Sequence, residues 1–409
     1  MRDGKRVRRG LFLVFLVLLL DIVGIAIIMP VLPAYLQELT GADVGEAAVD
    51  GGWLLLVYAA MQFLFAPVIG NLSDCFGRRP VLLISVLTFA VDNLICALAT
   101  SYWMLFIGRI LAGISGASYG TASAYIADIS DDGDRARNFG LIGIAAGAGF
   151  TLGPVIGGFL GELGPRVPFY GAAALSFLNF ILGLFLLPET LERVNRRRFE
   201  WTRANPLGAL RQMRNHPGIG WIGLVFFLYW LADRVYLSVW SFVSAYRYGW
   251  SEGQIGLSLG VYGVSGALVM VVVLPRLVTR FGEWRTVALG LVFSALGMAG
   301  YAAAWQGWMV YVVIIATALE SLVEPPLRSI ASAHVPPSAQ GELQGALTSI
   351  SSLTTIIGPL VFTQVFGYFT GPAVGYAFPG APYALAGGLV AVCLALFLLQ
   401  VRPLARSAS

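Results

Sequence analysis

Long apolar segments separated by short polar ones extend over nearly the whole chain. Each apolar segment has roughly 18–25 residues, the length that a helix needs to cross about 30 Å of hydrocarbon. The pattern predicts an all-α polytopic membrane protein with twelve transmembrane helices in two sets of six. The predicted spans are about 11–35, 52–71, 81–100, 102–127, 138–160, 168–188, 219–244, 254–274, 286–305, 308–333, 343–369 and 380–401.

The largest polar interruption, at 189–218, separates the two sets of six. We therefore predict an N-terminal six-helix bundle over 1–190, a cytoplasmic linker over 191–218 and a C-terminal six-helix bundle over 219–409. The interruption contains seven arginines: Arg193, Arg196, Arg197, Arg198, Arg203, Arg211 and Arg214.

Short strings repeat between the two halves at a constant offset of 205 residues, half of the 409-residue chain. This offset indicates an internal duplication. Duplicated membrane halves are typical of transporters, whose substrate site lies between the repeats. The repeated strings are Phe76-Gly77 with Phe281-Gly282, Gly140 with Gly345, and Gly153-Pro154 with Gly358-Pro359.

The composition excludes an ordinary soluble protein, because 12% of the residues are charged compared with about 25% in soluble domains. The sequence contains no phosphate-binding loop of the GxxxxGK[ST] type and no cluster with metal-ligand spacing. We therefore expect no enzyme activity, no cofactor and no metal. The energy for transport would come from an ion gradient or from the substrate gradient.

The placement of the arginines predicts the orientation. Those outside the predicted spans lie almost entirely at the termini, in the linker and in the loops that follow even-numbered spans, whereas the opposite side has only Arg166 and Arg247. By the positive-inside rule, both termini are cytoplasmic. The net charge of +4 follows from this topology and requires no nucleic-acid partner. A single lysine, Lys5, favours a GC-rich bacterial genome, so we expect the bacterial inner membrane.

Three groups of motifs carry a family resemblance. The loop after the second span has Gly70, Asp74, Gly77, Arg78 and Arg79, the fourth span has Gly108-Arg109, and the fifth has Gly149, Gly153-Pro154 and Gly157-Gly158. Together they resemble the signatures of the drug:proton antiporters of the major facilitator superfamily. Asp21, Met29-Pro30, Met61-Gln62 and Asp92 extend the resemblance to the tetracycline/proton antiporter group.

The resemblance implies two six-helix bundles around a central cavity. It also implies export of an amphiphilic drug in exchange for protons, by alternating access and as a functional monomer in the lipid bilayer. Two alternatives remain open: a permease for an endogenous metabolite, and a receptor or scaffold that transports nothing. The carboxylates within the predicted spans argue against a simple facilitator, and the lack of large soluble segments argues against a scaffold.

Two of the motifs have a structural and a functional interpretation. Asp74 lies close in sequence to Arg78 and Arg79. The resemblance implies a cytoplasmic latch to the other half, where a helix N-terminus favours a carboxylate; the alternative is a solvated turn. Gly149, Gly153 and Gly157 are spaced four apart on one helical face. They indicate close helix packing, and the resemblance adds a hinge or seal between the halves.

Charges within the membrane are candidates for function because they are costly there. Asp21 and Asp92 fall near the middle of the first and third spans, and Arg109 lies within the fourth. Two acids with one base leave one carboxylate without a cationic partner. The resemblance implies substrate or proton-coupling roles for Asp21, Gln62 and Asp92, and a structural or coupling role for Arg109.

The second half departs from the tetracycline pattern. That pattern has a histidine and an aspartate for proton coupling where this chain has Gly266 and Ser294. New charges occur elsewhere in the second half. Pro325-Pro326 should bend the tenth span beside them. The new charges are Asp233, Arg234, Glu320, Glu324 and Arg328.

Two hypotheses account for these charges. In the first, Glu320 carries the proton while Glu324 pairs with Arg328, four residues later. In the second, Asp233, Arg234, Glu324 and Arg328 form one closed structural network. The seventh span is also rich in aromatic residues, which could line a drug cavity or face lipid. They are Phe226, Phe227, Tyr229, Trp230, Tyr236 and Trp240.

Overall fold

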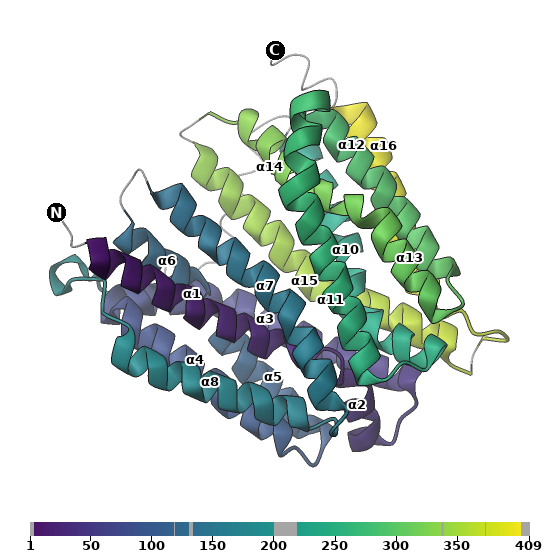
Figure 1. Ribbon diagram of the computed structural model, residues 1–409, viewed down its shortest axis with the longest axis horizontal. Coiled ribbons are helices and arrows are strands. Elements are labelled where there is room, and N and C mark those ends of the chain that lie inside the picture. The colour runs from purple at the N-terminus through teal and green to yellow at the C-terminus, as the bar shows by residue number, and fades with distance from the viewer. Residues whose placement is uncertain are drawn as a thin grey trace. The chain divides into compact units, whose positions relative to one another are not determined.

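The computed structural model describes residues 4–117, 119–130, 134–199, 219–336, 339–372 and 374–401. Regular structure in these ranges is entirely helical (Figure 1). Most of the predicted linker, from 200 to 218, lies outside the described residues. So do six terminal and linker arginines that support the predicted orientation: Arg2, Arg203, Arg211, Arg214, Arg402 and Arg406.

The first half of the chain forms eight α-helices followed by a short 3-10 turn. They are α1 Gly4–Ala26, α2 Leu32–Thr40, α3 Val44–Phe76, α4 Arg78–Ala97, α5 Tyr102–Gly116, α6 Tyr119–Ile129, α7 Arg135–Gly161, α8 Val167–Leu186 and η1 Arg193–Asn195.

The second half contains α-helices with one 3-10 and two π segments. They are α10 Ile219–Tyr248, α11 Glu252–Leu268, η4 Val269–Val273, α12 Leu274–Ala303, α13 Gly307–Thr317, η5 Ala318–Leu322, α14 Glu324–Ala333, α15 Gln340–Thr370, α16 Ala381–Leu396 and η7 Phe397–Val401.

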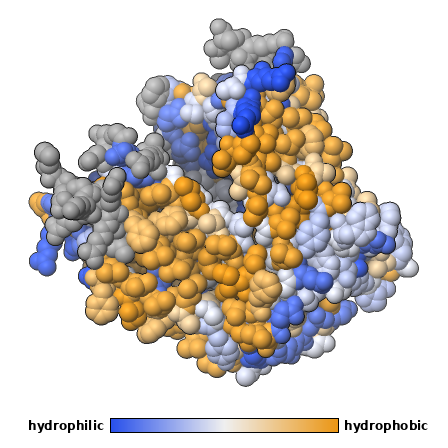
Figure 2. Space-filling view, viewed as in Figure 1, coloured by the Kyte–Doolittle hydropathy of each residue, from blue (hydrophilic) through white to orange (hydrophobic). Residues whose placement is uncertain are grey.

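The helices agree with twelve predicted spans. Among the described residues, nine helical segments are long and apolar enough to cross a membrane, and one of them, Glu252–Ala303, has 52 residues and a break at Gly282. This break makes two spans of it. The apolar helix Val14–Ala26 and the pair α5 and α6 supply the remaining two. Hydrophobic side chains cover broad areas of the face seen in Figure 2, as expected for surfaces in contact with lipid.

Three spans are divided between shorter helices, and one of them is the span that α5 and α6 share. The prediction of one continuous span over 11–35 is wrong, because α1 ends at Ala26 and α2 begins at Leu32. Pro30 lacks the backbone N–H that a continuous helix needs and lies in the turn over 27–31, and Pro33 lies in the first turn of α2, where a proline is tolerated. The bend predicted at Pro325-Pro326 is confirmed: η5 occupies 318–322 and α14 starts at Glu324.

The repeated Phe-Gly string has a structural cause. Gly77 has φ 106° and ψ 160°, and Gly282 has φ 77° and ψ 166°. Side chains rarely adopt this positive φ, and glycine adopts it without steric cost. Each glycine ends one span and begins the next without any further loop. The 205-residue repeat is therefore a repeat of backbone geometry as well as of sequence.

The chain forms two compact units. Unit 1 comprises Met1–Gly41, Val57–Pro206 and Ser251–Gly260, and unit 2 comprises Ala42–Leu56, Leu207–Trp250 and Val261–Ser409. The start of α3 thus belongs to unit 2, and the start of α11 to unit 1. The division into bundles at 190 and 219 stays a prediction.

The two arginines on the sparsely charged side each cap a helix. Arg166 donates to the carbonyl oxygens of Ala97 (3.1 Å) and Ala99 (2.7 Å) at the end of α4. Arg247 donates to those of Tyr301 (3.3 Å) and Ala302 (2.9 Å) at the end of α12. These carbonyls have no partner within the helix. The two exceptions to the charge bias therefore close the C-termini of equivalent helices in the two halves.

The glycine face of α7 packs against α1 in unit 1. A Cβ atom on Gly149 would lie 2.6 Å from Ile22 Cγ2, one on Gly153 2.6 Å from Ala26 Cβ, and one on Gly157 1.8 Å from the carbonyl oxygen of Ile27. Such distances are shorter than any real contact of a Cβ atom. The structure therefore confirms close helix packing as a role of this face.

Gly158 and Pro154 also contribute to unit 1. A Cβ atom on Gly158 would lie 2.5 Å from the carbonyl oxygen of Glu252, and one on Gly256 would lie 2.2 Å from that of Pro154. These residues bring α7 against the first turns of α11. The role of the helix as a hinge or seal between the halves stays a prediction.

We expect Gly157→Ala to lower the free energy of unfolding by about 1–3 kcal/mol, because the new methyl group meets backbone that cannot move aside without separating α7 from α1. Gly147→Ala is the matched control, since a Cβ atom there meets nothing within 4 Å. Thermal unfolding of the purified proteins in detergent measures both. Equal melting temperatures for the two variants would contradict the packing role of Gly157.

Candidate functional site

The acids and bases of unit 1 separate into an ion pair and a single carboxylate. Arg109 Nη2 on α5 lies 2.9 Å from Asp92 Oδ2 on α4, and the side chain of Asp92 is completely buried. Cys96 Sγ lies 3.5 Å from both Asp92 Oδ1 and Arg109 Nη2. The sequence left open which of the two acids Arg109 pairs with, and in the structure it pairs with Asp92.

Asp21 on α1 is the second acid. Its Oδ1 accepts a hydrogen bond of 3.1 Å from Asn179 Nδ2 on α8, and the same amide group donates to the carbonyl oxygen of Val17 at 3.1 Å. Within the part of the chain that the structure describes, Asp21 makes no ion pair. Asn179 could not be selected from the sequence, because one amide in an apolar span becomes informative only when its partner on another helix is known.

The family resemblance groups Gln62 with Asp21 and Asp92 by role, but its hydrogen bond goes to a different group. Its Nε2 donates to the carbonyl oxygen of Gly116 at the end of α5, at 3.0 Å. A Cβ atom on Gly116 would lie 2.8 Å from the hydroxyl of Tyr58. Gln62 and Tyr58 thus join α3 to the end of α5, and the coupling role of Gln62 stays a prediction.

We expect Asp92→Asn to lower the free energy of unfolding by about 3–5 kcal/mol, because it leaves the Arg109 charge buried without compensation. Replacing both residues, as in Asp92→Leu with Arg109→Met, should recover most of this loss, because no charge then remains. Thermal unfolding of the two single variants and the double variant gives the coupling. If the double variant loses as much free energy of unfolding as the two single variants lose together, the pair is not the structural unit described here.

Unit 2 contains a cavity of about 400 Å³ between α10, α11, α12 and the broken tenth span. Four of its lining residues are charged, and three are tyrosines. Ser294, one of the two positions that depart from the tetracycline pattern, also lines it. The lining residues are Tyr229, Asp233, Tyr236, Tyr262, Met270, Ser294, Glu320, Ser321, Glu324, Pro325 and Arg328.

Glu320 lies in η5, at the break of the tenth span, and is 5% exposed. Its Oε2 accepts a hydrogen bond of 2.8 Å from the hydroxyl of Tyr236 on α10. A Cβ atom on Gly297 of α12 would lie 3.4 Å from the same oxygen. Among the described residues, Glu320 makes no ion pair. It is therefore the counterpart in unit 2 of Asp21 in unit 1.

The other four charges that the sequence analysis singled out in the second half pair within their own helices. Arg328 Nε lies 2.9 Å from Glu324 Oε1, and its guanidinium lies 5.3 Å from the centre of the Trp230 ring. Arg234 Nη2 lies 3.6 Å from Asp233 Oδ2. These two local pairs favour the first hypothesis over one closed network between the seventh and tenth spans. The functional roles of the four residues stay predictions.

The two departures from the tetracycline pattern lie beside Glu320. Ser294 is 3% exposed and lines the same cavity. A Cβ atom on Gly266 would lie 3.0 Å from the hydroxyl oxygen of Ser321, the residue after Glu320. Ser294 thus shares the cavity of Glu320, and Gly266 lies against the residue that follows Glu320. This proximity was not accessible from the sequence, because it depends on how α11, α12 and η5 pack together.

The aromatic residues of the seventh span point inward. Five of the six, all except Phe227, are at most 8% exposed, so the lipid-facing interpretation is wrong for them. Tyr229 and Tyr236 line the cavity, and Tyr236 packs on Tyr262 at 5.0 Å and on Trp240 at 5.9 Å between ring centres. The two tyrosines therefore line a cavity, and its role as a drug cavity stays a prediction.

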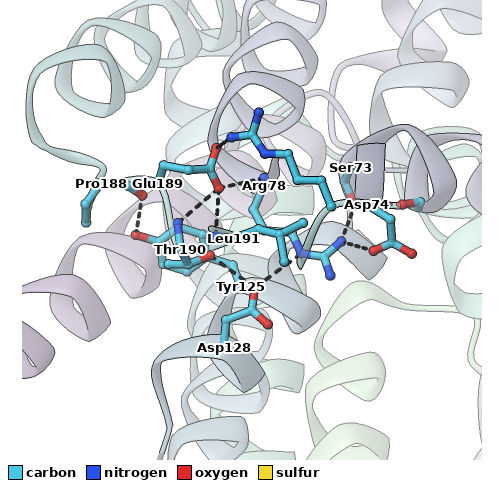
Figure 3. A network of polar contacts seen from close by, with 11 residues as sticks. Ser73, Asp74, Arg78, Tyr125, Asp128, Pro188, Glu189, Thr190 and Leu191 are labelled. Carbon is cyan, nitrogen blue, oxygen red and sulfur yellow. Dashed lines mark hydrogen bonds and ion pairs between the residues drawn. The ribbon is translucent and has the colours of Figure 1, made fainter. Parts of the chain in front are cut away.

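The loop after α3 belongs to a polar network at one end of unit 1 (Figure 3). Arg78 pairs with Asp74 and, at 3.3 Å, with Asp128 Oδ2 at the end of α6. Thr190 donates to the same oxygen of Asp128 at 3.1 Å. Arg79 instead donates to the carbonyl oxygen of Leu184 at 2.6 Å. Asp74 is thus held within its own unit, and a latch to the other half stays a prediction.

Glu189 is a second centre of this network, and the sequence-based prediction missed it. Its Oε1 accepts from the backbone N–H groups of Arg78 (2.9 Å), Thr190 (3.0 Å) and Leu191 (3.0 Å). It therefore caps the N-terminus of α4, where a carboxylate is favoured. A Cβ atom on Gly77 would lie 2.2 Å from Glu189 Oε2. The space at this position therefore excludes a larger residue, in addition to the positive φ. Gly70 has no such neighbour: a Cβ atom there meets nothing within 4 Å.

Comparison with known proteins adds independent information. The sequence matches the family described as Major Facilitator Superfamily over residues 14–359. It is 40% identical over 375 residues to the tetracycline resistance protein, class C, of Escherichia coli, which covers 92% of this chain and 93% of the relative. It is 26% identical to the quinolone resistance protein NorA of Staphylococcus aureus (strain MRSA252), over 88% of this chain and 90% of that one.

Solved structures agree on the fold. The crystal structure of a D-xylose-proton symporter matches with a TM-score of 0.77 at 17% identity, covering 96% of this chain and 98% of that one. The human organic anion transporter MFSD10 (TETRAN) matches with a TM-score of 0.69 at 24% identity, over 96% and 99%. At these identities, the similarity carries the fold alone.

Proposed function

Since this chain belongs to the major facilitator superfamily, we propose that it exports tetracycline-like or other amphiphilic drugs in exchange for protons, by alternating access. It is a multi-pass membrane transporter and not an enzyme. The relatives named for resistance to tetracycline and quinolones support a drug as the substrate. We place it in the bacterial inner membrane with both termini cytoplasmic, acting as a monomer.

One observation carries the proposal of proton coupling. Two carboxylates within the apolar helices make no ion pair among the described residues: Asp21 in unit 1, which is partly buried, and Glu320 in unit 2, which is buried. A buried charge without compensation is costly. Such a carboxylate is stable when it holds a proton or when a cationic ligand neutralises it. Alternation between these two states is what a drug:proton antiporter requires.

We assign the proton of the second half to Glu320. The histidine and aspartate of the tetracycline pattern are replaced by Gly266 and Ser294, yet both positions lie next to Glu320 or its neighbour Ser321. The position of Ser294 in the cavity of Glu320 supports the proposal that the carboxylate of the second half has moved to another place in the sequence. The break at η5 supports this role, because a 3-10 segment in mid-span is typical of a functional site.

Asp92 and Arg109 have a structural role in this proposal. Their mutual pairing leaves Asp92 no need of a proton or a ligand. Asp21 then remains as the first-half group that a proton or drug would neutralise, with Asn179 as a positioning residue. This division of roles separates two acids that the sequence pattern treats alike.

Drug accumulation in cells that lack their own efflux pumps tests the proposal. We expect expression of this chain to reduce the accumulation of tetracycline or of several lipophilic drugs, and a protonophore to restore it. Membrane abundance of the protein is measured in parallel. No change across the panel, with the protein present in the membrane, would contradict drug export and favour a permease for a metabolite.

A further inference from the structure

The turn at Gly282 is uncovered, although it repeats the backbone geometry of the turn at Gly77. In the first half, the carboxylates of Asp74 and Glu189 both bind the turn. In the second half, Thr279 stands 205 residues after Asp74, and a Cβ atom on Gly282 would meet nothing within 4 Å. Within the described ranges, no residue therefore covers the second turn as Glu189 covers the first.

Three arginines surround this second turn, and none of them makes an ion pair with another described residue. Arg276 donates to the carbonyl oxygen of Val272, and the Arg280 guanidinium lies 5.4 Å from the centre of the Phe281 ring. All three side chains are exposed, including that of Arg285, which follows the turn. The equivalent turn of the first half neutralises its arginine with carboxylates, whereas this one does not.

The neighbouring acid and the neighbouring segment do not supply a counter-charge. Glu283, the acid of this turn, accepts a hydrogen bond of 2.5 Å from Ser329 Oγ. The Trp284 ring stacks on that of Phe397 at 5.4 Å, which places η7 beside the turn. The sequence that follows η7, residues 402–409, contains two arginines and no acid. An anion for the arginines is therefore expected from outside the chain.

Two of these arginines continue an exposed apolar stripe. Leu268, Val272, Arg276 and Arg280 follow one another at intervals of four residues, and all four are exposed. Residues with this spacing are neighbours on a helix surface, and the bond from Arg276 to Val272 keeps them adjacent beside the π segment η4. Val271, which is 76% exposed, widens the apolar part. The stripe is apolar within the span and basic at its end, which matches the acyl chains and the anionic headgroup of a phospholipid.

The positive-inside rule accounts for arginines on this side of the membrane. It does not require them to lie in line with exposed apolar side chains. It also does not require them to lack a carboxylate partner, since Arg78 on the same side pairs with Asp74. The arrangement around Gly282 is therefore more specific than the rule.

We propose that this stripe binds one anionic phospholipid of the leaflet that faces the cytoplasm in the proposed orientation. The phosphate contacts Arg276 and Arg280, with Arg285 as a further positive charge, and the acyl chains cover Val271 and Val272. Each arginine near the membrane surface strengthens the binding of anionic lipid by about fivefold. This binding does not depend on which substrate the chain transports.

Binding of defined lipids to the purified full-length protein tests this inference. Native mass spectrometry of the protein in detergent measures the first bound phosphatidylglycerol over a titration, with phosphatidylcholine of the same acyl chains as the zwitterionic comparison. We expect phosphatidylglycerol to bind more tightly by about tenfold or more. Arg276→Gln with Arg280→Gln should remove most of this preference, whereas Arg276→Lys with Arg280→Lys should retain most of it, because the charge remains.

Arg193→Gln with Arg198→Gln is the matched control, because it removes two exposed arginines that lie in unit 1, after the last helix of the first half. It should keep the lipid preference of the wild type. Gel filtration and thermal unfolding of each variant exclude misfolding as the cause of a loss.

Three results would overturn the inference. Equal binding of the two lipids by the wild type would exclude recognition of an anionic headgroup. An equal loss of preference in the control variant would indicate general surface charge and no defined site. Displacement of the lipid by an equal concentration of soluble glycerol 1-phosphate would indicate a phosphate site to which the acyl chains contribute nothing.

Discussion

Glu320→Gln is expected to reduce proton-driven drug uptake into inverted membrane vesicles by about tenfold to a hundredfold, a typical range for the coupling of two ligands. The amide keeps the size of the side chain and can still accept the hydrogen bond from Tyr236. It can neither release a proton nor neutralise a cation. Transport of the drug down the drug's own gradient should be reduced less than uptake driven by a proton gradient, because the variant keeps the fold and the transport path.

A second-site change distinguishes a moved carboxylate from a damaged protein. Ser294 lines the same cavity as Glu320 and stands where the tetracycline pattern has its aspartate. Adding Ser294→Asp to Glu320→Gln should therefore restore a substantial part of the proton-driven uptake. Glu283→Gln, which makes the same chemical change in unit 2 outside the cavity lining, should transport as the wild type does. Failure of the double variant, with normal membrane abundance, would contradict the view that the two positions share one role.

Asp21→Asn should also abolish proton-driven uptake, with a loss of about tenfold or more. Asp21 is the acid of unit 1 without an ion pair among the described residues, and its one hydrogen bond comes from the amide of Asn179. The oxygen of the new amide can accept the same bond, so the geometry is preserved while the titratable charge is lost. Uptake is measured in inverted vesicles with and without a proton gradient.

The control for Asp21 is Asp134→Asn. Asp134 is exposed at the start of α7 and makes no side-chain cap, so the change should leave transport unaffected. Asn179→Leu should shift the pH dependence of uptake, because it removes the hydrogen bond that stabilises the charged form of Asp21. Wild-type uptake by Asp21→Asn would show that the proton of the first half is carried elsewhere.

The length of the apolar segments was sufficient to predict much of the fold. Segment length predicted the spans, because a membrane helix must be long and apolar whatever its neighbours are. The Phe-Gly repeat indicated an internal duplication, and in the structure Gly77 and Gly282 both have positive φ. The break in the first span was missed, since Pro30 and Pro33 were read as part of the family motif and not as interruptions of the helix.

The candidate site could be predicted only in part. Charged residues in apolar spans are conspicuous, so Asp21, Asp92, Arg109 and Glu320 were found from the sequence. Their partners were not, because the choice of Arg109 between two acids depends on the rotation and packing of three helices. The same holds for Asn179 beside Asp21 and for Ser294 in the cavity of Glu320. Polar residues of ordinary appearance acquired their roles from neighbours on other helices.

Proton movement driven by drug tests the central claim most directly. Purified protein is placed in liposomes that contain a pH-sensitive dye, and a drug gradient is applied without any imposed proton gradient. The account predicts proton flux opposite to the drug flux for the wild type and for Glu283→Gln, and none for Glu320→Gln. Drug flux without proton flux in the wild type, or unchanged proton flux in Glu320→Gln, would contradict it.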